Sequence, residues 1–416
     1  MLFLTPQYPY PPEQGTALRN YGLVRGIAER HAVTLLTFAS DPLPGDDPLA
    51  GLCHRIVSVP VPERSSQDRL RTLLTTSDPD MAHRLRSPAF REALHALLRE
   101  EQYDIVQVEG IEMAPYALQI AEWFGEERPR IVFDDHNVEY LLQRRAVTTD
   151  LGRPARWPWA LYSIAQWRRL LALERRVCRL ADAVIVVSEE DGIALRRPMP
   201  SLNPVVIPNG LDTDEYRQPR APATPLAHPA VLFTGKMDYR PNVDAVLWFH
   251  ARAWQAILAA EPEAHLYVVG KSPHQRLQAL EGDPSVTVTG YVPDVMPYFA
   301  AADVYIAPFR MGGGTRLKVL QALAAGLPLV TTSMGAEGIA LCDGIHARVA
   351  DSAAETAQAV VDLWQDREAA SRLATAGREF VANRHDWRAI VPQLEAVYAG
   401  LCRRLALHPD GEPAAR

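Results

Sequence analysis

The sequence predicts an α/β protein with two doubly wound domains, and three observations support this prediction. Short apolar runs alternate with longer amphipathic patterns along nearly the whole chain, which is typical of parallel sheets built from βαβ units. The chain has 416 residues, more than a single hydrophobic core usually contains. A proline-rich segment at 217–229 interrupts the alternation near the middle of the chain and predicts an extended linker.

Eleven short apolar runs are predicted strands, six in the first domain and five in the second. In chain order they cover 2–5, 33–38, 105–109, 131–134, 183–187 and 205–207, then 231–235, 266–270, 286–289, 304–306 and 328–332. The predicted organisation is an N-terminal domain over 1–216, the linker over 217–229 and a second domain over 230–385. A helix over 386–405 is expected to cross back to the first domain, followed by a flexible tail over 406–416.

The composition is that of an ordinary soluble globular protein, with 48% hydrophobic and 22% charged residues. The net charge of −7 argues against a dedicated nucleic-acid-binding protein, so we expect no nucleic-acid partner. The four cysteines have no CxxC spacing and indicate reduced thiols rather than disulfides or a zinc site. No apolar run approaches the roughly 18–20 residues that span a bilayer, so we expect a cytoplasmic protein.

A glycine-rich stretch, GGGTRLKVLQALAAG, follows the predicted strand 304–306 and leads into an amphipathic helix pattern. Glycines let a ligand approach the backbone, and a helix start offers unpaired N–H groups and the positive end of its dipole. Arg316 and Lys318 add positive charge within the first turn, which suits a diphosphate. We therefore interpret the stretch as an anion site, with a plain glycine-rich turn carrying two solvated basic side chains as the alternative.

Six segments of the sequence carry a family resemblance, and they occur in the family's order. They are FLTPQYPYPPEQG, FDDHNVEYLLQRR, VIPNGLDTDEY, LFTGKMDYRPNVDAVLWF, VTGYVPDVMPYFAAADVYIAPF and GGGTRLKVLQALAAG. The chain resembles the group 1, family 4-like glycosyltransferases, and more narrowly the bacterial sugar transferases of exopolysaccharide synthesis, from residue 2 to about residue 400. The resemblance implies a GT-B fold, in which two Rossmann-like domains face a central cleft.

The resemblance also implies the activity. The chain is expected to be a hexosyltransferase-like enzyme that moves a sugar from a nucleoside-diphosphate sugar, most simply a UDP- or GDP-sugar, to a glycan or lipid-linked acceptor. Transfer is expected to proceed with retention and without a metal or other cofactor, because basic side chains and a helix dipole neutralise the leaving diphosphate. The competing interpretations are a GT-B epimerase and a catalytically silent nucleotide-sugar or glycan-binding protein.

The resemblance places the donor mainly on the second domain. Lys236 and Lys318 are expected to be catalytic through the leaving diphosphate, with a solvated strand-end lysine as the alternative for Lys236. The implied donor-binding residues are Gly15, Gly313, Gly314, Thr315, Arg316, Gln321 and Glu337.

Two positions depart from the family pattern. Relatives commonly carry two glutamates eight positions apart, and Gly313 and Gln321 stand at those positions here. Gln321 can accept a hydrogen bond from a ribose hydroxyl but lacks a carboxylate's charge. Relatives also carry a second basic residue where Pro241 and Asn242 fall, and we expect Lys318, with Arg240 as a further candidate, to take over its role.

For the first domain the resemblance implies His136 as a catalytic residue near the donor sugar or acceptor. A histidine at a strand's carboxyl end can hydrogen-bond a sugar hydroxyl near neutral pH, and a buried structural histidine is the alternative. Asn137 and Glu139 are the expected acceptor-binding residues, although an acidic residue such as Glu139 also simply favours a helix start. The adjacent Asp134 and Asp135 project to opposite faces of a strand and make a poor metal site, so we expect none.

A basic and aromatic region covers residues 141–180, with nine arginines and three tryptophans. One interpretation is contact with an anionic membrane or a lipid diphosphate, chiefly through Arg153, Trp159 and the residues between them. The other is a helix whose buried stripe is formed by Trp167, Leu170, Leu171 and Val177.

Overall fold

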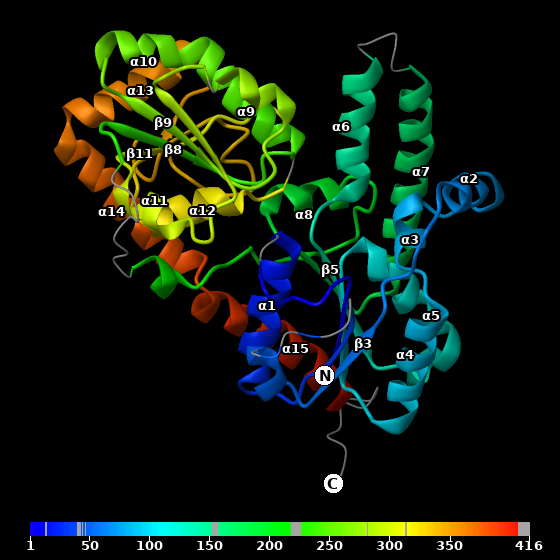
Figure 1. Cartoon of the computed structure of the whole chain (residues 1–416). Coiled ribbons are helices and arrows are strands. Elements are labelled where there is room, and N and C mark those ends of the chain that lie inside the picture. The colour runs from blue at the N-terminus through cyan, green and yellow to red at the C-terminus, as the bar shows by residue number, and fades with distance from the viewer. Residues whose placement is uncertain are drawn as a thin grey trace. The chain divides into compact units, whose positions relative to one another are not determined.

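The computed structural model of the protein describes residues 1–12, 15–39, 43, 45, 47–151, 157–217, 226–280, 282–312 and 314–406. The chain divides into two compact units. The first unit comprises Met1–Pro208 and the chain from Ile390 onward, and the second comprises Asn209–Ala389. Each contains one parallel sheet flanked by helices (Figure 1), so the α/β prediction with two doubly wound domains is confirmed.

The first unit contains a seven-stranded sheet in the order β3-β2-β1-β4-β5-β6-β7. Its strands are β1 (Leu2–Thr5), β2 (Thr34–Phe38), β3 (Arg55–Val59), β4 (Ile105–Glu109), β5 (Arg130–Asp135), β6 (Ala183–Val186) and β7 (Val205–Val206). Its helices are α1 (Gly15–Ala28), α2 (Ser66–Thr75), α3 (Asp80–Arg84), α4 (Pro88–Glu100), α5 (Ala114–Phe124), α6 (Glu139–Leu151), α7 (Trp157–Leu180) and α8 (Glu189–Arg196). In Figure 1, α6 and α7 run side by side as an antiparallel pair.

The second unit contains a six-stranded sheet in the order β10-β9-β8-β11-β12-β13. Its strands are β8 (Ala230–Thr234), β9 (His265–Val269), β10 (Val286–Gly290), β11 (Val304–Ala307), β12 (Leu329–Thr331) and β13 (Arg348–Val349). Its helices are α9 (Arg240–Phe249), α10 (Gln255–Ala260), α11 (Met296–Ala301), α12 (Leu317–Ala324), α13 (Ala353–Gln365) and α14 (Arg367–Arg384), and α15 (Trp387–Ala406) follows.

All eleven predicted strands are present, and two further strands were missed. Both missed strands, β3 and β13, lie at the edge of their sheets. The side chains of β3 are largely exposed or half-buried, and β13 is only two residues long. Neither has the continuous apolar run that marks the central strands, which are fully buried because helices cover both faces.

The boundary between the units falls earlier than the sequence predicted, after Pro208 rather than after residue 216. The intervening segment joins the second unit because it pairs with the end of α14. The amide of Leu211 donates to the carbonyl of His385 at 2.9 Å, and the hydroxyl of Thr213 donates to Asp386 at 2.5 Å. Most of the predicted linker, 218–225, and the predicted tail from residue 407 lie outside the described residues.

The last helix connects the end of the second unit to the first unit along the chain. It begins at Trp387, and its residues from Ile390 onward belong to the first unit. Ile390, Leu394 and Tyr398 are buried there, and Val391 fills the space beside Gly26 of α1. A Cβ atom at residue 26 would overlap the Val391 side chain, so the missing side chain of glycine permits this helix contact.

Within the described part of the chain, no helix has both the length and the apolar content needed to cross a bilayer.

Candidate functional site

Each sheet has a topological switch point, where consecutive connections leave toward opposite edges. In the first unit this point lies between β1 and β4, and in the second it lies between β8 and β11. Loops after the carboxyl ends of such strands diverge and leave a crevice where ligands bind. The predicted site residues follow β1 and β5 in the first unit and β8, β11 and β12 in the second, so each set lies at the carboxyl edge of its own sheet.

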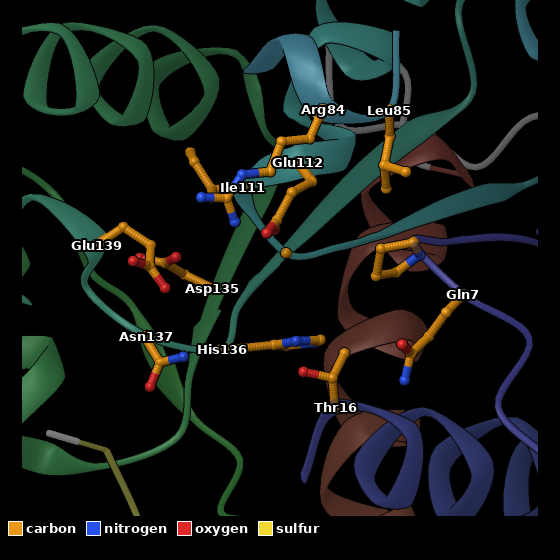
Figure 2. A pocket seen from close by; sticks show the side chains of 12 residues that line it. Gln7, Thr16, Arg84, Leu85, Ile111, Glu112, Asp135, His136, Asn137 and Glu139 are labelled. Carbon is orange, nitrogen blue, oxygen red and sulfur yellow. The ribbon is translucent and has the colours of Figure 1, made fainter. Parts of the chain in front are cut away.

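The first unit has a cavity of about 270 Å³ at its switch point. Its lining comes from the segments after β1 and β4, from the end of β5 and the residues after it, and from the end of α3. The lining residues are Pro6, Gln7, Thr16, Arg84, Leu85, Gly110, Ile111, Glu112, Asp135, His136, Asn137 and Glu139. We call this cavity the first-unit pocket. In Figure 2, His136 reaches across the pocket toward Thr16 and Gln7, while Glu139 and Asp135 lie on the opposite side. The structure thus brings together His136, Asn137 and Glu139, the catalytic and acceptor-binding residues that the sequence selected for this domain.

The imidazole of His136 forms a hydrogen bond with Glu109, the last residue of β4. The Nε2 atom of His136 lies 2.7 Å from Oε2 of Glu109, whose side chain is fully buried. Burial by itself lowers the pKa of the imidazole, but the hydrogen bond to Glu109 and the charges of Asp134 and Glu109 outweigh it and raise the pKa. Burial and the charge of Asp134 also raise the pKa of Glu109.

Asp134 takes part in a buried ion pair with Arg19 of α1. The guanidinium donates to Oδ2 of Asp134 at 2.7 Å and to Oδ1 at 3.0 Å, and both side chains are almost fully buried. Arg19 also donates to the carbonyl of Pro208 at 3.1 Å. Arg19 thus connects α1 to Asp134 of β5 and to Pro208, and the two-pronged guanidinium–carboxylate contact fixes both partners of the ion pair.

Glu109, Asp134 and His136 are the one group in the described residues with ligand atoms close enough together to hold a metal ion. Both oxygens of Asp134 already accept from Arg19, and the positive charge of that guanidinium opposes a cation at the same carboxylate. The arrangement therefore fits a charge-compensated network better than a metal site, and metal independence stays a prediction.

Burial raises the pKa of two further carboxyl groups of the pocket, Glu139 and Asp135. Burial, followed by the charge of Glu112, raises the pKa of Glu139 to about 7. Burial and the charges of Glu174 and Glu139 raise the pKa of Asp135 well above its usual value, and neither of its oxygens has a hydrogen-bond partner in the described part of the protein. A protonated carboxyl donates and a carboxylate accepts, so these groups suit a ligand rich in hydroxyls.

The second unit carries the glycine-rich stretch between β11 and α12. Gly312 and Gly314 adopt φ angles of 114° and 74°, which only glycine tolerates easily. A Cβ atom at residue 312 would lie 2.6 Å from a guanidinium nitrogen of Arg316. The hydroxyl of Thr315 is buried and has no hydrogen-bond partner among the described residues. Gly313 lies outside the described residues.

Lys318 lies beneath this loop, and its ammonium group points toward the end of β8. Its Nζ donates to the carbonyl of Thr234 and to Oδ1 of Asn242, both at 2.8 Å. It also lies 4.8 Å from the ring centre of Phe233. Burial, followed by the charge of Arg316, lowers the pKa of Lys318 to about 7.

Asn242 connects the two predicted catalytic lysines. Its Nδ2 donates to the backbone carbonyl of Lys236 at 2.7 Å, while its Oδ1 accepts from Lys318. The ammonium group of Lys318 thus interacts with the residue that stands where relatives carry a second basic residue. The side chain of Lys236 itself is exposed and pairs with Asp238 at 3.3 Å.

The remaining predicted donor residues are more widely spread. Nε2 of Gln321 donates to the hydroxyl of Tyr216 at 2.9 Å, which leaves its Oε1 for another donor. Glu337 is half-buried in the turn after β12, at the same edge of the sheet. Gly15 is the first residue of α1 in the first unit, next to Thr16 of the pocket.

The basic and aromatic region forms α6 and α7. Leu170 and Val177 of α7 are buried, and Trp167 and Leu171 pack against the core, as the helix interpretation predicted. Residues 152–156 and the side chains of 157–161 lie outside the described structure, so the proposed contact from Arg153 to Trp159 stays a prediction.

Sequence reasoning missed two residues that line the first-unit pocket, Arg84 and Glu112. It also missed Glu109 and Arg19, the buried partners of His136 and Asp134. Glu109 and Glu112 flank Gly110 at the carboxyl end of a predicted strand, and that position could have marked them. Arg19 is 115 residues from its partner Asp134, and no local pattern connects the two.

Two family models match consecutive parts of the chain. The model described as Glycosyltransferase Family 4 matches residues 14–215, and the model described as Glycosyl transferases group 1 matches residues 228–366. Together they include the predicted site residues of both units.

Curated relatives are mannosyltransferases. A phosphatidyl-myo-inositol mannosyltransferase of Mycobacterium leprae is 30% identical over 201 residues, which cover 47% of this chain and 53% of the relative. A GDP-mannose-dependent alpha-(1-6)-phosphatidylinositol monomannoside mannosyltransferase of Mycobacterium tuberculosis is 27% identical over 254 residues, 55% of this chain and 65% of the relative. The match spans about half the length of the first of these relatives.

Solved structures share the fold along nearly the whole chain. A sucrose-phosphate synthase from Thermosynechococcus elongatus has a TM-score of 0.71 at 19% identity, covering 97% of this chain and 99% of the other. The Anabaena protein HepE, in complex with UDP and glucose, has a TM-score of 0.65 at 14% identity, covering 96% and 99%.

Proposed function

Because this chain belongs to the family 4-like group 1 glycosyltransferases and has their GT-B fold, we propose that it transfers a sugar from a nucleoside-diphosphate sugar to a hydroxyl group of a glycan or lipid-linked acceptor. The observation that carries the proposal is the complementary chemistry of the two switch points. One has a basic glycine-rich loop, and the other has a pocket of hydrogen-bonding groups around a histidine.

The second unit supplies the donor site in this proposal. Breaking the bond between the sugar and the phosphate develops negative charge on the leaving diphosphate. Arg316, Lys318 and the N–H groups of Gly314 and Thr315 would neutralise that charge, and the unpartnered Thr315 hydroxyl would donate to a phosphate oxygen. Gln321 would accept from a ribose hydroxyl through Oε1. Lys236 and Glu337 complete the proposed donor contacts.

The first unit supplies the acceptor site in this proposal. Asn137, Glu139 and Glu112 would hydrogen-bond the hydroxyls of the acceptor, and His136 would bind the hydroxyl nearest the reaction. Mannosyltransferase relatives that use phosphatidylinositol favour a glycolipid acceptor, whereas the motif resemblance favours an exopolysaccharide intermediate. Both are polyhydroxyl acceptors. The proposal also includes a hexose donor, retention of the anomeric configuration and metal independence. The choice of donor sugars, the anomeric configuration of the product and the effect of EDTA test these three points separately.

The test measures transfer and donor binding together. Purified protein is incubated with UDP-, GDP-, ADP- and TDP-sugars, with and without bacterial lipid-linked acceptors and with EDTA, and released nucleotide and anomeric configuration are followed by NMR. Thermal shifts with the free nucleoside diphosphates report donor binding through mass action. The Arg372→Ala variant, which changes an exposed arginine on α14, serves as the control for Lys318→Ala.

We expect one nucleotide to stabilise the wild-type and Arg372→Ala proteins but not Lys318→Ala, together with turnover of the matching donor. Nucleotide binding without turnover on any donor would instead support the silent-binder alternative, with Gly313 and Gln321 as its cause.

A further inference from the structure

A buried row of hydrogen bonds leads from the last helix to His136. The hydroxyl of Tyr398 on α15 donates to Oε1 of Gln107 at 3.1 Å. Nε2 of Gln107 donates to Oε1 of Glu109 at 3.0 Å, and Oε2 of Glu109 lies 2.7 Å from Nε2 of His136. Tyr398, Gln107 and Glu109 are all buried, and all four residues belong to the first unit.

The hydrogen bonds of the row run in one donor-to-acceptor direction because the hydroxyl of Tyr398 keeps its proton. Burial, followed by the charges of Glu109 and Asp134, raises the pKa of Tyr398 well above its usual value, so its hydroxyl stays a donor. The Gln107 amide must then accept with its oxygen and donate with its nitrogen. Glu109 receives that donation at Oε1, which leaves Oε2 to accept from Nε2 of His136.

Because Nε2 donates to Glu109, the other imidazole nitrogen, Nδ1, remains available to a ligand in the pocket. Nδ1 of His136 lies beside Gly110, since a Cβ atom placed on residue 110 would be 3.6 Å from it. Gly110 also lines the first-unit pocket and has a φ angle of 83°. A side chain at residue 110 would therefore crowd Nδ1 of His136 at the edge of the pocket.

We propose that Glu109, Gln107 and Tyr398 are positioning residues that hold His136 by its Nε2–H and present Nδ1 to a substrate hydroxyl. The inference rests on the proposed function, in which His136 contacts the substrate. It extends that function to a residue on the last helix, 262 positions along the chain from the histidine that it orients.

The charges around the row come from four elements. Glu109 ends β4 and Asp134 lies on β5, while Arg19 of α1 pairs with Asp134. Tyr398 approaches from α15, where Glu395 also acts on its pKa. Removing the charge of Glu109 therefore changes the charge facing His136 without removing the Arg19–Asp134 ion pair.

The first arm of the test needs no substrate. The full-length protein carries ¹⁵N-labelled histidine, and NMR records the tautomer and titration of His136, assigned by comparison with His136→Ala. The variants are Glu109→Gln, Tyr398→Phe and Tyr140→Phe. Tyr140→Phe is the matched control, because its buried hydroxyl donates to the carbonyl of Ala194 at 2.7 Å, outside the row.

In the wild type we expect the proton of neutral His136 on Nε2. Glu109→Gln should lower the titration midpoint of His136, Tyr398→Phe should shift it less in the same direction, and Tyr140→Phe should leave it unchanged. An unchanged midpoint and tautomer in Glu109→Gln would overturn the inference whatever the activity.

The second arm measures transfer with the donor that the nucleotide-sugar screen selects. We expect Glu109→Gln to lower kcat by at least about tenfold with little change in the donor KM, because acid–base and hydrogen-bonding groups act on the reacting atoms. Tyr398→Phe should lower kcat by less and shift its pH profile, whereas Tyr140→Phe should change neither. If His136→Ala kept full activity although Glu109→Gln moved the titration, the proposed role of His136 would be wrong while the hydrogen-bonded row would stand.

Discussion

At the scale of single residues, the ammonium group of Lys318 would make diphosphate binding at the proposed donor site depend on pH. Its pKa in the folded protein is about 7, against 10.5 for an exposed lysine. Between these values the unfolded chain binds more protons than the folded one, so this group makes the free energy of unfolding rise as pH rises from about 7 to 10.5. A bound diphosphate would raise the pKa again by adding negative charge.

The protein should therefore take up protons when it binds its nucleoside diphosphate at pH 8. Calorimetry of that binding in two buffers of different ionisation enthalpy should reveal an uptake that approaches about one proton per nucleotide. Lys318→Met should abolish the uptake and weaken binding. Equal uptake in Lys318→Met would show that another group titrates.

Glu174 of α7 is a second residue whose charge state limits stability. Its side chain is completely buried, one oxygen accepts from the amide of Tyr140 at 3.2 Å and the other has no partner among the described residues. Burial raises its pKa well above 4.5. The unfolded chain releases this proton above about pH 4.5 while the folded protein retains it, so the carboxyl destabilises the fold increasingly as pH rises.

We expect Glu174→Gln to be more favourable to stability at pH 8 than at pH 4. Urea unfolding of both proteins at the two pH values measures the difference. A stability change that is the same at both pH values would contradict the assigned protonation.

At the scale of elements, the packing of α1 on α15 depends on a missing side chain. A methyl group at residue 26 would overlap Val391, and overpacking of a tight contact typically costs about 1–3 kcal/mol. Gly26→Ala should therefore destabilise the protein even though alanine favours helices. The double variant Gly26→Ala/Val391→Ala should recover much of the loss in urea unfolding, and equal loss in both would point to another cause.

At the scale of the whole molecule, the first unit is built from two distant parts of the chain. The chain leaves it after Pro208 and returns at Ile390. The returning helix covers Gly26 and supplies Tyr398 to the row that reaches His136.

A chain truncated after residue 389 should therefore lose stability in its first unit more than in its second. Hydrogen exchange should show faster exchange in β1, β4 and α1 than in β8 and β11. Uniform exchange in both units would show that the last helix is dispensable for the first.

The sequence by itself determined the elements whose signals are local. Continuous apolar runs identify buried strands of parallel sheets, so eleven of the thirteen strands in the described residues were predictable and the two short or exposed edge strands were not. The glycine-rich stretch with Arg316 and Lys318 was recognisable because a helix start, its charges and its glycines are contiguous. His136, Asn137 and Glu139 were selected through the family resemblance, whose motif is also contiguous because the three residues follow one strand.

Only the tertiary structure decided which groups control those residues. Glu109 contacts His136, Arg19 contacts Asp134 and Tyr398 contacts Gln107 because β1, β4 and β5 are neighbours in the sheet and α15 returns to it. Strand order is a property of packing rather than of local sequence. The inward direction of Lys318 has the same origin. Its partners at Thr234 and Asn242 lie 84 and 76 residues away, and burial among them is what lowers its pKa.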